Sequence, residues 1–103
     1  MDKIKWIKLK RIAEEVTNKK VEFVASTHIT DYRAFVICDK HDNITVYFNM
    51  EYAKDIKLII ISLAHELAHV VLMNDAHDNQ FEDEKEKLIT KITKNYNKEE
   101  LCA

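Results

Sequence analysis

Two histidines and a glutamate within residues 65–69 are the side chains of this protein best suited to chemistry. The stretch reads His-Glu-Leu-Ala-His, the HExxH pattern. Because side chains four residues apart lie one above the other on a helix, His65 and His69 can offer two imidazole nitrogens to one tetrahedral metal ion. An apolar helix that buries two imidazoles and a carboxylate needs a partner for them, and a divalent cation is such a partner. The pattern therefore predicts a zinc site.

Glu66 is too close to the backbone of its neighbours to be a third ligand. We expect it to act as the general base, which takes a proton from water and passes it to the leaving amine. A catalytic zinc has three protein ligands and one open position, so another donor has to follow. His77 is the predicted third ligand, because it begins the last predicted helix on the face that should turn toward the central helix. Glu84 lies on the same helical face and is the alternative ligand.

The elements that position these residues predict an α+β fold. The patterns indicate helices at 3–19, 56–73 and 77–96, and strands at 21–26, 34–39 and 44–49. We expect the three strands to form a small antiparallel sheet, whose last two strands form a hairpin over a polar turn. Asp55 is the predicted N-cap of the central helix, which is apolar almost all round and carries the HExxH pattern. We also expect strand 44–49 to border the cleft, where an exposed edge could bind an extended peptide.

Length and composition limit the classes of function. The 103 residues predict a single domain, residues 1–103, with one modest core. Charged residues make up 33 % of the chain with a net charge of -2, which argues against a nucleic-acid or membrane partner. The start of the chain lacks the pattern of a signal peptide, so we expect a cytoplasmic protein. There is no glycine and no proline, so turns have to be made by Asn and Asp.

The sequence also gives expectations for the cysteines, for two tyrosines and for the remaining histidines. Cys38 and Cys102 are too few for a disulfide framework, and Cys38 is expected to be a small buried residue of a strand. Tyr52 and Tyr96 are candidate oxyanion donors only because they are near the motif-bearing helices in the sequence. The remaining histidines, His28 and His41, lie in loop-like stretches and are expected to be solvated.

The HELAH motif on a central helix resembles the minigluzincins, which are small soluble zinc metallopeptidases. The resemblance also rests on the preceding helix and three strands, and on a histidine, His77, that opens a final helix. It implies a minimal zincin-like or gluzincin-like fold and a zinc site made of His65, His69 and His77. It further implies that Glu66 is the base and that the substrate is a peptide or protein. Gluzincins usually have a glutamate as third ligand, which keeps Glu84 as the alternative.

The resemblance also implies latency. C-terminal segments in such proteins obstruct the cleft, and here the candidates are the final helix and the tail at 97–103. Both are long enough to swap between protomers, which implies a homodimer formed through the C-terminal helix. The expected protein is then a zymogen whose site is built but closed.

Two other functions remain open from the sequence. An SprT-like protease of DNA-linked proteins also uses HExxH followed by a histidine, but such proteins carry a basic surface, and a net charge of -2 argues against one. The other alternative is a non-catalytic regulatory module that holds zinc without turnover. The short chain, which has no separate substrate subdomain, favours this second alternative.

Overall fold

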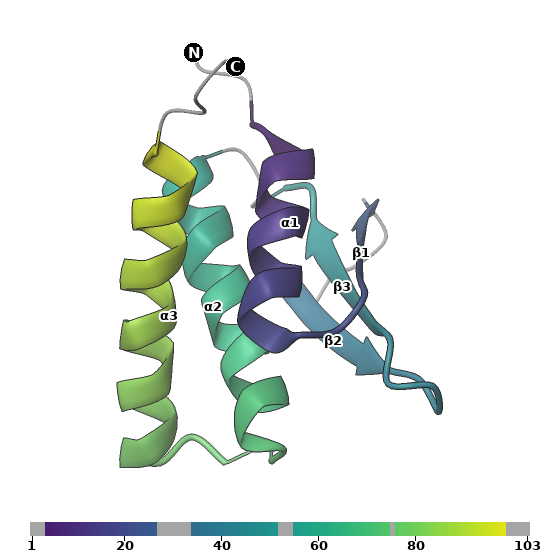
Figure 1. Ribbon diagram of the computed structural model, residues 1–103, viewed down its shortest axis with the longest axis vertical. Helices are drawn as coiled ribbons and strands as arrows, with labels where there is room; N and C mark the ends of the chain where they lie inside the picture. The colour runs from purple at the N-terminus through teal and green to yellow at the C-terminus, as the bar shows by residue number, and fades with distance from the viewer. Residues whose placement is uncertain (1–3, 27–33, 52–54, 75, 99–103) are drawn as a thin grey trace.

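The computed structural model describes residues 4–26, 34–51, 55–74 and 76–98, and these residues form three helices and three strands. In chain order they are α1 (Trp6–Thr17), β1 (Val21–Ser26), β2 (Ala34–Cys38), β3 (Ile44–Asn49), α2 (Ile56–Leu72) and α3 (Asn79–Asn97). The helices lie on one side of the sheet (Figure 1). Helices α1 and α2 contact the strands, whereas α3 packs on α1 and α2. The predicted α+β fold class is confirmed.

The sheet is mixed, which corrects the prediction of an antiparallel sheet. Its strand order is β1-β3-β2. Strands β2 and β3 form the predicted antiparallel hairpin, but β1 runs parallel to β3, with Val21 opposite Ile44. The prediction was wrong for β1 because the seven residues 27–33 between β1 and β2 do not force these strands to be neighbours. Strand β3 has the most apolar inward face, with Ile44, Val46 and Phe48 buried, and takes the central position.

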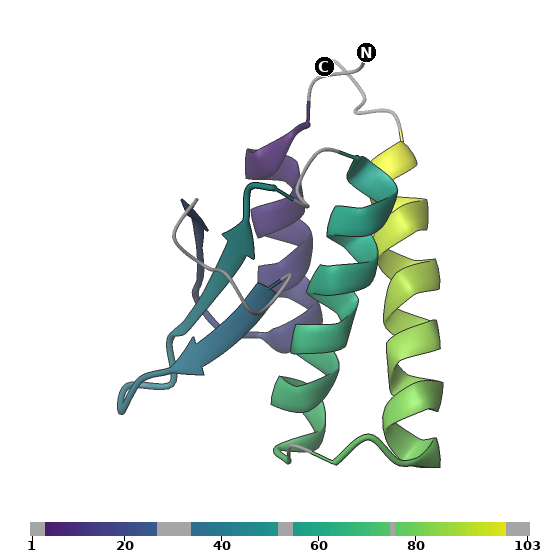
Figure 2. The same ribbon diagram turned by 180° about the vertical axis from the view of Figure 1, so that it is seen from behind.

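The central position of β3 also corrects the prediction of an exposed edge at residues 44–49. Strand β3 pairs with β1 on one side and with β2 on the other, so it cannot accept a peptide as a further strand. Strand β2 is at the edge of the sheet and contacts α2 (Figure 2). The edge strand that borders the motif-bearing helix is therefore β2.

Helix α2 is the centre of the core, as predicted. Its buried side chains are Ile59, Ile60, Leu63, Ala64, Leu67, Ala68 and Val70. On one side of the core, Trp6 of α1 packs with its ring centroid 5.4 Å from that of Phe48 and 6.0 Å from that of Phe23. Helix α1 is thereby fixed to the sheet.

None of the helices among the described residues is long and apolar enough to cross a membrane.

Both ends of α2 are defined by local hydrogen bonds. At the start, Asp55 is the predicted N-cap, and its Oδ1 accepts a hydrogen bond from the Lys57 backbone N–H at 2.7 Å. At the end, the N–H of Met73 donates to the carbonyl of Val70 and the N–H of Asn74 donates to the carbonyl of His69, both at 3.3 Å. These two bonds form a Schellman motif. The motif brings Asn74 back to the last turn of α2.

Three described residues adopt positive φ in this chain without glycine. Asn18 (φ 55°) and Asp42 (φ 66°) fit the prediction that Asn and Asp make the turns. Met73 (φ 57°) was not predicted, because its Cβ disfavours the left-handed conformation that the end of α2 requires. Its side chain is 89 % exposed, so packing does not explain the choice. Helix α2 therefore ends on a strained residue.

Replacement of Met73 by glycine should stabilise the protein. Glycine adopts positive φ without a Cβ clash, so Met73→Gly is expected to raise the free energy of unfolding by about 1 kcal/mol. Urea unfolding in the presence of a chelator measures this as a higher midpoint at an unchanged slope. Met50→Gly is the matched control, because Met50 is also exposed and does not have positive φ. An equal effect of both substitutions would contradict the assignment of strain to Met73.

Candidate metal centre

Three histidines from two segments come together at one end of α2. His65 and His69 lie one turn apart on α2, with ring centroids 5.0 Å apart. Each of these residues and His77 offers a ring nitrogen within 4.8 Å of the other two. The Nε2 atoms of His65 and His77 are 3.4 Å apart. Two nitrogens bound to one tetrahedral ion at the usual metal–nitrogen length would be about 3.4 Å apart. The three side chains are thus close enough to bind one metal ion.

His77 joins this cluster, but it does not do so from a helix. The last helix was predicted to begin at His77, whereas α3 begins at Asn79. Asp78 is the N-cap, and its Oδ1 accepts a hydrogen bond from the Phe81 backbone N–H at 2.9 Å. His77 therefore precedes the cap, is exposed, and reaches the α2 histidines from the link between the two helices. The expected helical face for His77 was wrong, although the expected proximity to His65 and His69 is confirmed.

The backbone of the α2–α3 link orients His69. Its Nδ1 lies 3.1 Å from the carbonyl oxygen of Asn74. Because a carbonyl oxygen only accepts hydrogen bonds, Nδ1 carries the proton and Nε2 keeps its lone pair for a metal ion. Second contacts of this kind fix the ring and the tautomer of metal-binding histidines. Met73 and the Schellman motif place this carbonyl, so the strained end of α2 is directly connected to the site.

Phe81 packs against all three histidines, which the sequence did not indicate. Its ring centroid lies 4.9 Å from those of His65 and His77 and 4.6 Å from that of His69. The side chain is fully buried. Sequence periodicity assigned Phe81 to the inward face of the last helix but gave it no role in the site. Its spacing of four residues from His77 was no signal for such a role, because His77 precedes α3.

Burial lowers the pKa of His65 below its usual value. The electrostatic effects of the neighbouring His69, His77 and Lys85 act in the same direction, whereas that of Glu82 opposes them. Lys85 is held near the cluster, with Nζ 5.9 Å from the Phe81 ring centroid and 3.2 Å from Oε2 of Glu82. His65 is therefore neutral near pH 7, and the neutral ring is the form that binds metal ions.

Glu66 is half-buried on α2, beside His65. Burial raises the pKa of its carboxyl group to about 7. A carboxyl group with a pKa near the working pH can take up and release a proton with little free-energy cost in either direction. This property fits the role of general base predicted from the sequence.

The other residues considered from the sequence lie elsewhere. Glu84 is half-buried on α3 but does not belong to the metal-binding group found among the described residues. His41 is exposed in the β2–β3 turn, as expected. The hydroxyl of Tyr96 accepts a hydrogen bond from the Lys5 N–H at 3.1 Å, near the start of α1 and at the opposite end of α3 from His77 (Figures 1 and 2). Tyr96 is therefore no oxyanion donor for this site. Outside the described residues lie His28, Tyr52 and Cys102.

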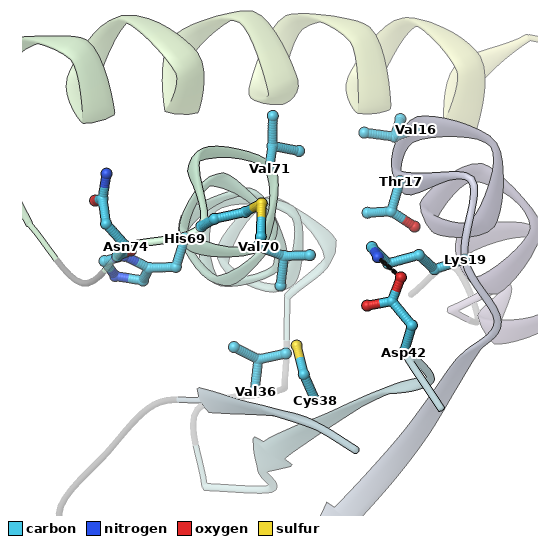
Figure 3. A pocket seen from close by; sticks show the side chains of 11 residues that line it. Val16, Thr17, Lys19, Val36, Cys38, Asp42, His69, Val70, Val71 and Asn74 are labelled. Carbon is cyan, nitrogen blue, oxygen red and sulfur yellow. Dashed lines mark hydrogen bonds and ion pairs between the residues drawn. The ribbon is translucent and has the colours of Figure 1, made fainter. Parts of the chain in front are cut away.

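A pocket of about 610 Å³ lies around the end of α2 next to the cluster. His69 and Asn74 lie at one side of it, and the ion pair of Lys19 with Asp42 lies at the other (Figure 3). Between them the lining is mostly apolar: Val16, Thr17, Val36, Cys38, Val70, Val71 and Met73. The expectation that Cys38 is buried was wrong, because it is the last residue of β2 and its side chain lines this open pocket.

The chain has no significant match among protein families, curated proteins or solved structures. The resemblance to minigluzincins stays a prediction that rests on the motif and the order of the elements. Support for any function therefore comes from the geometry of the histidine cluster and its surroundings.

The raised pKa of Glu66 predicts how the stability of the metal-free protein depends on pH. Between the ordinary value of 4.5 and about 7, the folded state holds a proton on Glu66 that the unfolded state has lost. This contribution to stability is complete below pH 4.5 and is lost as the pH rises through 7. Glu66→Gln removes the loss, so its stability relative to wild type should increase over this range. Urea unfolding with a chelator at each pH tests this, and a constant difference would contradict it.

Proposed function

We propose that this protein is a zinc-dependent peptidase. The observation that carries the proposal is the cluster of His65, His69 and His77, together with the half-buried Glu66 that follows His65 in α2. Three imidazole nitrogens at these distances suit tetrahedral zinc and leave a fourth position open, which is the arrangement of catalytic zinc sites. A purely structural zinc site would be closed by a fourth protein ligand.

The chemistry of the proposed reaction divides between the metal and Glu66. Zinc at a site of this kind activates water and polarises the carbonyl group that is attacked. Glu66 accepts the proton that the water loses and delivers it to the amine that leaves. Burial brings the pKa of Glu66 to about 7 in the metal-free protein, and a carboxyl group raised in this way suits a role as base in the first step and as acid in the second.

The proposed substrate is a peptide segment that crosses the end of α2 beside β2. Strand β2 is at the edge of the sheet and contributes Val36 and Cys38 to the pocket next to His69. The apolar walls formed by Val36, Val70 and Val71 suit an apolar side chain of the substrate. We therefore propose that an apolar residue next to the cleaved bond is preferred.

Latency and the homodimer remain predictions. Asn97 and Lys98 are the described part of the predicted latency tail, and they lie at the opposite end of α3 from His77. The carbonyl of Lys98 accepts a hydrogen bond from Lys8 Nζ at 2.6 Å, which holds this end of α3 on α1. These contacts give the described tail residues a role in joining α1 to α3.

The ligand set also fits a second candidate, the SprT-like proteases of DNA-linked proteins. These also have a histidine after HExxH, and the structure brings together three histidines without Glu84. The proposed metal chemistry is the same in both cases, but the substrate differs. Salt-sensitive binding of the purified protein to DNA would favour this second candidate, and its absence would favour a peptidase without a nucleic-acid partner.

Glu66→Gln should abolish peptidase activity without loss of zinc. General acid–base catalysis contributes roughly 100-fold to 10,000-fold, so we expect kcat of the variant to fall by an amount in that range. Zinc content should be unchanged, because Glu66 is not one of the three clustered side chains. Cleavage of a quenched fluorescent peptide library with apolar residues, together with metal analysis of the same samples, measures both quantities.

Glu84→Gln is the matched control, since Glu84 is a half-buried glutamate on the neighbouring helix outside the cluster. It should keep both activity and zinc. Full metal-dependent activity in Glu66→Gln would contradict the proposed role of Glu66. A zinc-loaded wild-type protein that cleaves neither peptides nor proteins, and that gains no activity when it is truncated before Asn97, would favour the non-catalytic module over a latent enzyme.

A further inference from the structure

The three clustered histidines are not held in place in the same way. Helix α2 fixes the backbones of His65 and His69, and the Asn74 carbonyl orients the ring of His69. His77 has neither support, because it is exposed and precedes the first residue of α3. A side chain in such a link would lose conformational freedom on binding a metal ion, which lowers affinity unless something else restrains it.

The Phe81 ring provides that restraint. It is fully buried at the start of α3, so its own position is set by the core. The hydrogen bond from its N–H to Asp78 fixes the turn that connects it to His77. The rings of Phe81 and His77 meet edge to face, with centroids 4.9 Å apart and planes at 76°. Edge-to-face contacts at this separation are favourable.

The same Phe81 ring also contacts the helix-borne ligands. It lies nearly parallel to His69, with centroids 4.6 Å apart and planes at 25°, and it meets His65 edge to face at 4.9 Å. One buried ring therefore touches the histidine from the link and both histidines from α2. Among the described residues, no other ring outside the cluster contacts all three histidines.

We propose that Phe81 is a positioning residue of the metal centre, which holds His77 against the His65 and His69 pair so that the third nitrogen is in place before the metal binds. The proposal goes beyond the peptidase function, because it concerns the assembly of the centre and applies whether or not the centre hydrolyses peptides. Phe81 affects metal binding by positioning His77, because α2 already places the other two ligands.

The test is a titration of the metal-free protein with Co²⁺, followed by visible absorption, with Zn²⁺ affinity measured by competition. Loss of a residue that orients a ligand typically lowers metal affinity by about 10-fold to 100-fold, and we expect this loss for Phe81→Leu. The absorption of bound Co²⁺ should weaken as well, because a site that loses a nitrogen gains water and coordination number. Leu88→Ala is the control for packing, since Leu88 is a buried residue of α3.

A double-mutant cycle separates positioning from general destabilisation. In a His77→Ala background, Phe81→Leu should change metal affinity by less than about threefold, because the ligand through which it acts is gone. Leu88→Ala should stay within about threefold of wild type in the same titration. The role of Phe81 is overturned if Phe81→Leu binds as tightly as wild type, if Leu88→Ala loses as much, or if the full loss persists without His77. A wild-type protein that does not bind Co²⁺ or Zn²⁺ would instead overturn the metal centre and with it the proposed function.

Discussion

Helix α3 packs against α2 through the buried ring of Phe81, and the metal centre depends on this contact. Helix α2 supplies two imidazoles by itself, because their spacing matches one helical turn. The third imidazole has to come from another segment. The sharp turn after α2 and the cap of α3 bring Nε2 of His77 to 3.4 Å from Nε2 of His65. Six residues join the two helices. Their path includes the turn at Met73, the Asn74 carbonyl that contacts His69, and the Asp78 cap of α3. The short link is therefore as much a part of the centre as the HExxH helix.

Burial acts on the two kinds of titratable group in opposite senses. It lowers the pKa of His65, which is therefore neutral near pH 7, and it raises the pKa of Glu66 to about 7, so that this carboxyl group can hold or release a proton there in the metal-free protein. A neutral imidazole is ready to bind a metal ion, and a bound dication would favour the ionised form of the neighbouring carboxyl group. A larger fraction of Glu66 would thus be ionised, and so able to accept a proton, when the centre is loaded.

The local features of the fold could be predicted from the sequence, and the non-local ones could not. The Asp55 cap and strands β1 and β3 followed from short-range patterns and were confirmed at the predicted residues. The parallel pairing of β1 with β3 depends on which strand fills the centre of the sheet, and hydrophobic alternation does not determine strand order. The start of α3 was misplaced by two residues because Asp78 is a better cap than Ala76, which would have to cap a helix that begins at His77. The role of Phe81 could not be predicted, because core periodicity does not show what a buried ring touches.

The most direct test of the account is a zinc-binding titration of the metal-free wild-type protein, His77→Ala and Glu84→Ala by competition with a chromophoric chelator. The account predicts one tightly bound zinc per chain in wild type and in Glu84→Ala, and a loss of affinity on the order of 100-fold or more in His77→Ala. Tight zinc binding that survives in His77→Ala but is lost in Glu84→Ala would contradict the three-histidine centre.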